Sequence, residues 1–269
     1  MTGKRLYSLG YLTGNGVDPV TAVKIAAEHG YDMVSFRLLP AAGETLHPLL
    51  DDDTLLADVK AAMRDTGVTM ADAEMIRLKP DTDLDSVTPF LDRISELGAR
   101  HVLVAIDDTD PARTQDNYTA LCHRLGDYRL TADLEFMPWT GCKDLGSARR
   151  LVEAADHPSA AVLFDTLHFD RCGSTLDELA ALPASLMNYV QICDGPVPFD
   201  PSDEGLIMVA RTARMIPGEG GIDLAAIAAH IPPGMTVSVE VPNQDLTARF
   251  GASEVARRSL EATKRLLGD

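Results

Sequence analysis

Four oxygen-bearing side chains stand at the ends of four separate hydrophobic segments of this 269-residue chain. They are Glu135 in Ala-Asp-Leu-Glu-Phe-Met, Asp165 in Val-Leu-Phe-Asp-Thr-Leu-His, Gln191 in Tyr-Val-Gln-Ile-Cys-Asp and Glu240 in Val-Ser-Val-Glu-Val-Pro. A carboxylate among apolar residues is costly to bury unless a cation or another partner compensates it. Any one of them could instead cap the following helix or pair with a Lys or Arg. Four together indicate one convergent site, and such oxygen donors suit Mg²⁺ or Mn²⁺.

The spacing of these residues fits a repeated strand–helix unit. Glu135 and Asp165 are 30 residues apart and Asp165 and Gln191 are 26 apart, each about one unit long. Gln191 and Glu240 are 49 apart, which requires an enlarged loop, and the Pro-, Gly- and Asp-rich segment 195–221 supplies it. The four side chains are therefore expected on strands five to eight of one sheet.

Hydrophobic segments alternate with segments of helical period along the whole chain. Strands are predicted at 5–13, 32–39, 67–77, 101–107, 130–138, 160–168, 187–194 and 235–242. Helices are predicted at 18–29, 51–66, 84–98, 115–126, 144–155, 175–182, 222–230 and 252–267. This pattern predicts an α/β fold, a (β/α)8 TIM barrel formed by residues 1–269 as a single domain, with its site at the carboxyl ends of the strands. A doubly wound open sheet is the alternative, but no Gly-x-Gly-x-x-Gly follows the first strand.

The composition of the chain narrows the classes of function that it can have. The net charge of −17 repels nucleic-acid phosphates, so no nucleic-acid partner is expected. No apolar run approaches the roughly 18 residues of a membrane span, and the N-terminal segment has too short an apolar stretch for a signal peptide. The four cysteines form no Cys-x-x-Cys pair, which favours a reducing cytoplasm. A small-molecule substrate is the expected partner, with no membrane partner; a homo-oligomer is compatible with these features.

Asp165-Thr-Leu-His168 resembles the Asp-x-x-His element of the xylose isomerase-like TIM-barrel family, which includes ketose epimerases, hydroxypyruvate isomerases, inosose dehydratases and 3-dehydroshikimate dehydratases. The segment Pro217-Gly218-Glu219-Gly220-Gly221-Ile222-Asp223 is similar to the family's Pro-Gly-x-Gly…Asp turn. The resemblance extends over the whole chain, with its fingerprint in 130–245. In an extended strand, residues 165 and 168 would point to opposite faces, so both reach one pocket only if the strand ends or bulges between them.

The resemblance implies a role for each of these residues. Glu135, Asp165, Gln191 and Glu240 match the four ligands of one divalent metal, Mn²⁺ or Mg²⁺, with Co²⁺ or Zn²⁺ also accommodated. Glu135 and Glu240 would double as catalytic acid and base, and His168 would contact a substrate oxygen.

The chain departs from many relatives at two positions. Gln191 stands where many isomerases and epimerases of the family carry His, and the run Tyr189 to Pro196 is closer to the 3-dehydroshikimate dehydratase pattern. In strand two, where many relatives have a Glu, the chain has Arg37. Arg37 could bind a substrate carboxylate or phosphate through two hydrogen bonds, or pair with an acidic side chain.

Four further side chains are candidates for substrate binding. Arg211 and Arg214, three residues apart beside the enlarged loop, could form an anion clamp or a solvated helix face. Glu74 is another polar residue near a strand end, and Trp139, the only tryptophan, follows strand five and could form a pocket wall or pack in the core.

This residue set predicts proton abstraction α to a carbonyl through a metal-stabilised enediolate. Returning the proton gives isomerisation or epimerisation of a sugar-like hydroxy-carbonyl compound, which we rank first because it is the commoner activity of the family. Loss of a β-hydroxyl would instead give dehydration of a cyclic hydroxy-ketone such as 3-dehydroshikimate. A non-catalytic barrel that binds a small molecule is the third reading. A multi-zinc nuclease of the same fold is disfavoured by the scattered histidines and the negative charge.

Overall fold

The computed structural model describes residues 4–14, 16–41 and 43–269. These residues form eight parallel strands that close into one barrel in chain order, β1 to β8, with β1 paired to β8. The strands are β1 (Tyr7–Leu9), β2 (Met33–Arg37), β3 (Thr69–Leu78), β4 (His101–Ile106), β5 (Thr131–Glu135), β6 (Ala160–Asp165), β7 (Tyr189–Ile192) and β8 (Thr236–Val239). The predicted TIM barrel is therefore confirmed.

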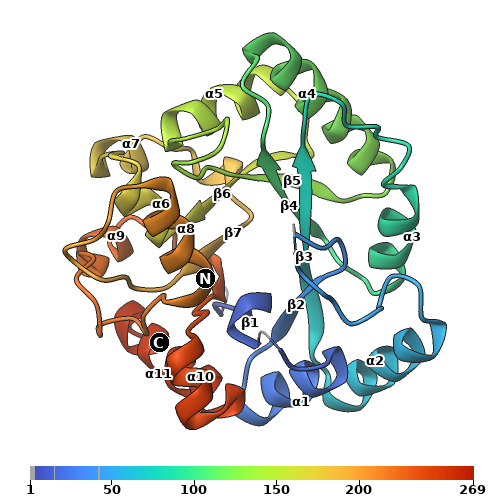
Figure 1. The fold of residues 1–269 in the computed structure, drawn as a ribbon, viewed down its shortest axis with the longest axis vertical. Helices are drawn as coiled ribbons and strands as arrows, with labels where there is room; N and C mark the ends of the chain where they lie inside the picture. The colour runs from blue at the N-terminus through green and yellow to red at the C-terminus, as the bar shows by residue number, and fades with distance from the viewer. Residues whose placement is uncertain (1–3, 15, 42) are drawn as a thin grey trace.

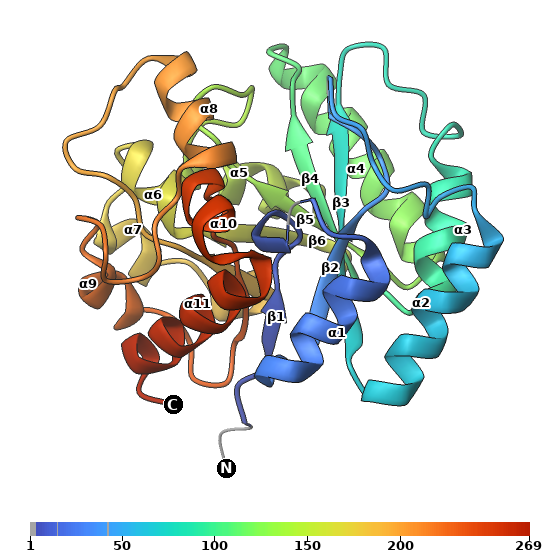
Figure 2. The same cartoon turned by 60° about the horizontal axis from the view of Figure 1, so that its bottom comes forward.

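Helices lie around the outside of the barrel (Figure 1) and over the carboxyl ends of its strands (Figure 2). They are α1 (Pro19–His29), α2 (Asp53–Thr66), α3 (Thr88–Glu96), α4 (Pro111–Asp127), α5 (Leu145–Ala155), α6 (Thr166–Arg171), α7 (Leu176–Ala180), α8 (Asp203–Thr212), α9 (Leu224–Ala228), α10 (Gln244–Phe250) and α11 (Ala252–Leu267), with 3-10 turns at Tyr11–Gly14 and Ala184–Leu186. Within the described part of the chain, no helix is long and apolar enough to span a membrane.

The two faces of each strand are buried in different surroundings. The main hydrophobic core lies where residues such as Val102, Leu134 and Val162 meet the surrounding helices. A much smaller apolar cluster of Leu103, Leu163 and Tyr189 forms separately. Polar side chains are buried at alternating positions of the same strands, as with Asp133 and Glu135 of β5 and Gln191 of β7. Alternation along each strand therefore directs these polar groups into the barrel.

Three short helices depart from the sequence prediction. The segment 160–168, expected to be one strand, divides into β6 and α6 at Asp165. The segment 195–221, expected to be an irregular loop, contains α8, which lies above the carboxyl ends of the strands in Figure 2. The third, α10, follows β8. All three are ten residues or shorter, and helices of this length show few helical periods in a sequence, although the equally short α7 and α9 were predicted.

Candidate functional site

The four predicted metal ligands lie together at the carboxyl ends of adjacent strands. Glu135 is the last residue of β5, Asp165 is the last of β6, and Gln191 pairs in register with Asp165. Glu240 directly follows β8, and its backbone N–H donates to the carbonyl of Ile192 at 3.1 Å. All four residues are at most 3% exposed. The topology thus brings together residues that are spread over more than 100 positions of sequence.

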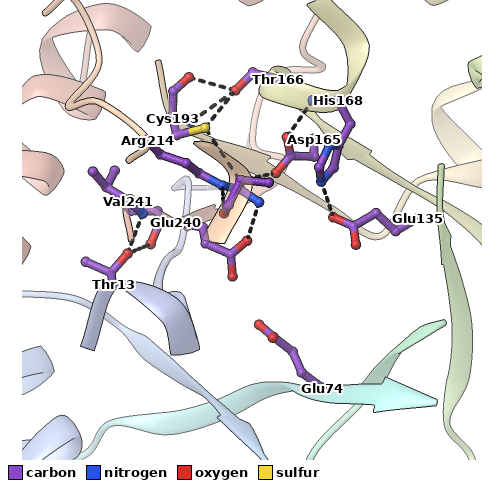
Figure 3. Close-up of polar contacts among 12 residues, drawn as sticks. Thr13, Glu74, Glu135, Asp165, Thr166, His168, Cys193, Arg214, Glu240 and Val241 are labelled. Carbon is purple, nitrogen blue, oxygen red and sulfur yellow. Dashed lines mark hydrogen bonds and ion pairs between the residues drawn. The ribbon is translucent and has the colours of Figure 1, made fainter. Parts of the chain in front are cut away.

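The end of β6 places both Asp165 and His168 at the site. Asp165 is the N-cap of α6, and its Oδ1 accepts a hydrogen bond of 3.0 Å from the backbone N–H of His168. This turn brings His168 back over the strand end, so that Nε2 lies 3.5 Å from Oε1 of Glu135 (Figure 3). The helical turn explains how side chains three residues apart reach the same pocket.

The position of Glu240 is fixed from β1 and the turn after it. Thr13 Oγ1 donates to the carbonyl of Val239 at 2.9 Å and accepts from the N–H of Val241 at 2.6 Å, so it holds the backbone on both sides of Glu240. Gly10 allows the chain after β1 to lie this close to the end of β8. A Cβ at position 10 would be 2.8 Å from the carbonyl oxygen of Val239 and 3.1 Å from Cβ of Glu240. Any larger residue at position 10 would push β8 and its carboxylate away.

A pocket with about 480 Å³ of empty space opens above these groups. It is lined by eight of the residues singled out from the sequence, namely Arg37, Glu74, Glu135, Trp139, His168, Arg211, Arg214 and Glu240. Asp165 and Gln191 lie deeper, with no exposed surface. This volume includes space that is open to solvent at the mouth of the barrel.

Glu135, Asp165 and His168 form the tightest cluster of ionisable donors, with one ligand atom of each within 4.8 Å of the others. The terminal amide atom of Gln191 that faces this cluster lies 3.0 Å from Oε1 of Glu135 and 3.2 Å from Oδ2 of Asp165. If that atom is nitrogen, it donates a hydrogen bond to each carboxylate. If it is oxygen, three oxygens converge and need a cation between them.

The spacing of these oxygens fits a small divalent ion. Octahedral oxygen ligands at the Mg²⁺ distance of about 2.1 Å lie roughly 3 Å from their neighbours, which is the separation found between Gln191 and the two carboxylates. Rotation of one amide by half a turn converts the hydrogen-bonded arrangement into an oxygen-donor set. Glu135, Asp165 and Gln191 therefore fit the metal expected from the sequence.

Glu240 is joined to this cluster through Arg214. One guanidinium nitrogen of Arg214 donates to Oδ2 of Asp165 at 2.6 Å, and the other lies 3.3 Å from Oε2 of Glu240 (Figure 3). The three side chains are at most 3% exposed. The structure thus gives Arg214 two carboxylate partners, which leaves it less available as a clamp for a substrate anion than the sequence suggested.

Arg37 and Glu74 form a second buried ion pair on the opposite side of the pocket. Nη2 of Arg37 donates to Oε2 of Glu74 at 2.6 Å, and Nη1 contacts Glu44 at 3.2 Å. The guanidinium also stacks on the ring of Tyr11 at 4.9 Å. The Oε1 atom of Glu74 is buried without a hydrogen-bond partner among the described residues. This oxygen is available to a substrate hydroxyl, with Arg37 holding the carboxylate in place.

Burial and neighbouring charges divide the carboxyl groups into two kinds. Burial, followed by the charge of Asp165, raises the pKa of Glu135 to about 8. Burial, followed by the charge of Glu74, raises the pKa of Glu240 well above its usual value. Burial is the largest influence on Asp165 and opposes its ionisation, but the charges of Arg214 and His168, together with the hydrogen bonds from these two residues, outweigh burial and lower the pKa of Asp165. Asp165 is therefore ionised more readily than a free carboxyl group, whereas burial favours the protonated forms of Glu135 and Glu240. With a pKa of about 8, Glu135 can exchange a proton near neutral pH, as acid–base catalysis requires.

His168 is held neutral between Glu135 and the pocket wall. Burial lowers the pKa of His168 to about 4, and its Nδ1 has no hydrogen-bond partner among the described residues. The ring of Trp139 meets the imidazole edge to face at 5.1 Å between centroids. A neutral imidazole fixed in this way can donate or accept one hydrogen bond from a substrate oxygen without carrying charge.

Arg211 is the one arginine of the pocket that makes no ion pair within residues 4–14, 16–41 and 43–269. It is exposed at the mouth. Burial of part of its guanidinium, followed by the charges of Arg77 and Arg37, lowers the pKa of Arg211. Several cations thus face the same opening, a field that favours an anionic group of a ligand.

Arg77 is a pocket residue that the sequence analysis missed. It lies three residues after Glu74 on β3, and regular alternation would place the two on opposite faces. The pairing of β3 with β4 shifts register between Ala73 and Ile76, so both side chains line the pocket. The signal in the sequence was its position at the end of the predicted strand 67–77, the same signal that identified Glu135.

Solved structures with the same fold include several whose subjects are enzymes. The chain matches a xylose isomerase-like TIM barrel/4-hydroxyphenylpyruvate dioxygenase fusion protein with a TM-score of 0.81 and 21% identity, covering 98% of this chain but only 43% of the fusion protein. It matches a zinc-bound structure of the IolI protein with a TM-score of 0.79 and 18% identity over 98% of both chains. It matches D-allulose 3-epimerase from Methylomonas sp. in complex with D-allulose with a TM-score of 0.70 and 18% identity over 98% of both chains.

At these identities the structural matches establish the fold alone. The sequence has no match among the curated proteins with which it was compared. A family model described as "xylose isomerase-like TIM barrel" matches residues 23–266, which include every site residue named above except those of the turn after β1. With the closed eight-stranded barrel and the carboxylates at its carboxyl end, this match shows that the chain belongs to the xylose isomerase-like TIM-barrel family.

Proposed function

We propose that this protein is a divalent-metal-dependent isomerase or epimerase that acts on a sugar-like hydroxy-carbonyl compound by removing the proton α to the carbonyl. The observation that carries the proposal is the pair Glu135 and Glu240, two buried carboxyl groups with raised pKa values that face one pocket from different strands. Two such groups allow one to accept a proton and the other to donate one.

Glu135, Asp165, Gln191 and Glu240 would hold the ion, and oxygen-only ligation favours Mn²⁺ or Mg²⁺ over softer metals, with Co²⁺ or Zn²⁺ tolerated. The bound ion would supply Lewis-acid stabilisation of negative charge on the substrate oxygens. The IolI structure contains a zinc atom, and a D-allulose 3-epimerase shares the fold, which supports a metal and this reaction class without identifying either.

The other pocket residues would position the substrate. Glu74, held by Arg37, would accept a hydrogen bond from a substrate hydroxyl through its free Oε1. His168 would contact a substrate oxygen, and Trp139 would cover the sugar-like face and exclude water. Glu135 or Glu240 would take the α-proton, and the other would return one at the neighbouring carbon or on the opposite face.

Exchange of the substrate α-proton with solvent tests this proposal. The metal-loaded protein in heavy water is expected to incorporate one deuterium into a ketose or ketose phosphate and to form an isomer. The mass of that isomer should be the mass of the substrate plus the gain from this one deuterium. A protein that binds Mn²⁺ but exchanges no proton with any member of a panel of hydroxy-carbonyl compounds would instead be a binding barrel.

A dehydratase acting on a cyclic hydroxy-ketone that carries a carboxylate, such as 3-dehydroshikimate, is a second candidate. Two observations favour it, namely Gln191 in place of the usual His and the cations Arg211 and Arg77 at the mouth of the pocket. Dehydration would give a conjugated product with new ultraviolet absorbance, so the same panel read by absorbance and by mass separates the two reactions.

Arg211→Ala is expected to raise KM about 10-fold for a carboxylate- or phosphate-bearing substrate, since a charge-assisted contact contributes roughly 1.5 kcal/mol or more. The KM of a neutral ketose is the internal control and should change little, because it has no group for Arg211 to bind. Steady-state kinetics on both substrate types measure the difference. An equal increase in KM for both substrate types would mean that Arg211 shapes the pocket and does not bind the anionic group of the substrate.

A further inference from the structure

Every nitrogen of the Arg214 guanidinium group is engaged inside the site. Nε donates to the carbonyl of Ala210 at 2.8 Å, Nη1 donates to Asp165 at 2.6 Å and contacts Sγ of Cys193 at 3.5 Å, and Nη2 lies 3.3 Å from Glu240. The side chain is 3% exposed. A guanidinium with each nitrogen engaged and almost no contact with solvent has little capacity left to bind a substrate group.

The backbone of Arg214 is held as firmly as its side chain. Its N–H donates to the carbonyl of Pro242 at 3.0 Å, and its own carbonyl accepts from Nδ2 of Asn243 at 2.7 Å. Both partners belong to the segment that follows β8 and Glu240. Arg214 is therefore a fixed part of the wall that carries two of the proposed ligands, and not a mobile arm of the loop.

The position of Arg214 affects the charge balance of the site. Glu135, Asp165 and Glu240, when ionised, carry three negative charges in a buried space, and Arg214 is the cation that contacts two of them. Three carboxylates and one guanidinium leave two negative charges, which one divalent ion neutralises. Without Arg214, Asp165 and Glu240 would lose their cationic partner in the metal-free protein, a costly arrangement at this depth.

We infer that Arg214 is a built-in counter-cation of the metal site: it bridges Asp165 and Glu240, holds both carboxylates on the wall before metal arrives, and sets the residual charge to that of a single divalent ion. This inference rests on the proposed function. It makes Arg214 a positioning residue, in contrast to both the substrate-anion clamp and the solvated helix face that its sequence context left open. The two roles predict different behaviour in the absence of any substrate.

Thermal unfolding of Arg214→Met, with and without Mn²⁺, tests the inference. The metal-free variant is expected to unfold roughly 10 °C below the wild type, because breaking a buried ion pair leaves an uncompensated charge. Saturating Mn²⁺ should raise the midpoint of the variant at least twice as much as that of the wild type, since the ion replaces part of the missing positive charge. Arg211→Met is the matched control, and it should unfold like the wild type in both conditions because Arg211 has no carboxylate partner in the described residues.

An Arg214→Met variant with wild-type midpoints in both conditions would overturn the inference. If that variant folds only when Mn²⁺ is present, the inference is supported. If it does not fold at all, Arg214→Lys decides, because a single ammonium nitrogen lacks the two spaced, coplanar nitrogens with which the guanidinium holds both carboxylates. A metal-free midpoint about 5 °C below the wild type is then expected by the same reasoning, and an unchanged midpoint would contradict the bridge. Failure of the wild type to respond to any divalent ion would count against the proposed metal site, and the metal-free comparison of Arg214→Met with Arg211→Met would still report on Arg214.

Discussion

Glu135→Gln is expected to lower kcat about 1000-fold, within the range of roughly 100- to 10,000-fold that general acid–base groups contribute. Glu135 is assigned both as a metal ligand and as a proton carrier. The amide of glutamine has no negative charge to attract the ion, and it cannot act as an acid or a base. The substitution should leave the fold intact. Burial already raises the pKa of Glu135 to about 8, so its carboxyl group is neutral at pH 7 in the metal-free protein, and the amide has nearly the same shape.

Asp133→Asn is the matched control for this variant. Asp133 lies two residues earlier on β5, points into the same barrel and is also fully buried, but it accepts a hydrogen bond of 2.9 Å from Nδ2 of Asn188 and is absent from the pocket lining. Its substitution should reduce stability by about 1–3 kcal/mol, the cost of disturbing a buried hydrogen bond, with kcat retained. Turnover by Glu135→Gln above one tenth of the wild-type value would remove Glu135 from proton transfer.

The sequence was sufficient to predict the barrel and the residues at its mouth for a physical reason. Parallel strands covered by helices must be apolar, so a carboxylate at the end of such a strand is conspicuous, as Glu135 and Asp165 are. The carboxyl ends of all strands of a parallel barrel lie on one side. Residues from strands five to eight therefore had to converge once the alternation of elements was recognised.

The pairing of Arg214 could not be predicted in the same way. Its contacts with Asp165 and Glu240 depend on the path of the segment 195–223, which returns over the barrel through α8. Asp194 shapes that path, since its carboxylate accepts hydrogen bonds from the backbone N–H groups of Gly218 and Gly220 at 2.9 and 3.0 Å. These contacts join residues more than 20 positions apart and leave no periodic signal in the sequence.

Local irregularities account for the other differences. The strand predicted at 160–168 ends at Asp165 because its side chain caps α6, and a cap of this kind looks the same in sequence as a polar strand residue. Arg77 was missed because a register shift in β3 breaks the alternation between it and Glu74. Both irregularities lie at the mouth of the barrel, and each adds a side chain to the pocket.

The protonation of Glu135 also predicts how metal binding and stability depend on pH. The folded protein raises the pKa of this carboxyl group from 4.5 to about 8, so the protonated form favours the metal-free fold. The contribution of this group to metal-free stability is fully present below pH 4.5 and is lost as the pH rises towards 8. Metal binding has the opposite dependence, because a ligand must lose its proton before it can bind the ion.

Loss of the Glu135 proton is therefore expected to lower the dissociation constant for Mn²⁺ about 50-fold between pH 6 and pH 8. The change approaches tenfold per pH unit well below the pKa of about 8 and levels off above it. The fluorescence of Trp139 can report it, since this is the only tryptophan and its ring lies 5.1 Å from that of His168 in the same pocket. Titration of the wild type with Mn²⁺ at several pH values gives the slope. Glu135→Gln is the control, in which the part of the slope due to this group should disappear. An affinity of the wild type that does not change between pH 6 and pH 8 would mean that Glu135 does not bind the ion as a carboxylate, and the assignment of the metal site would then have to exclude it.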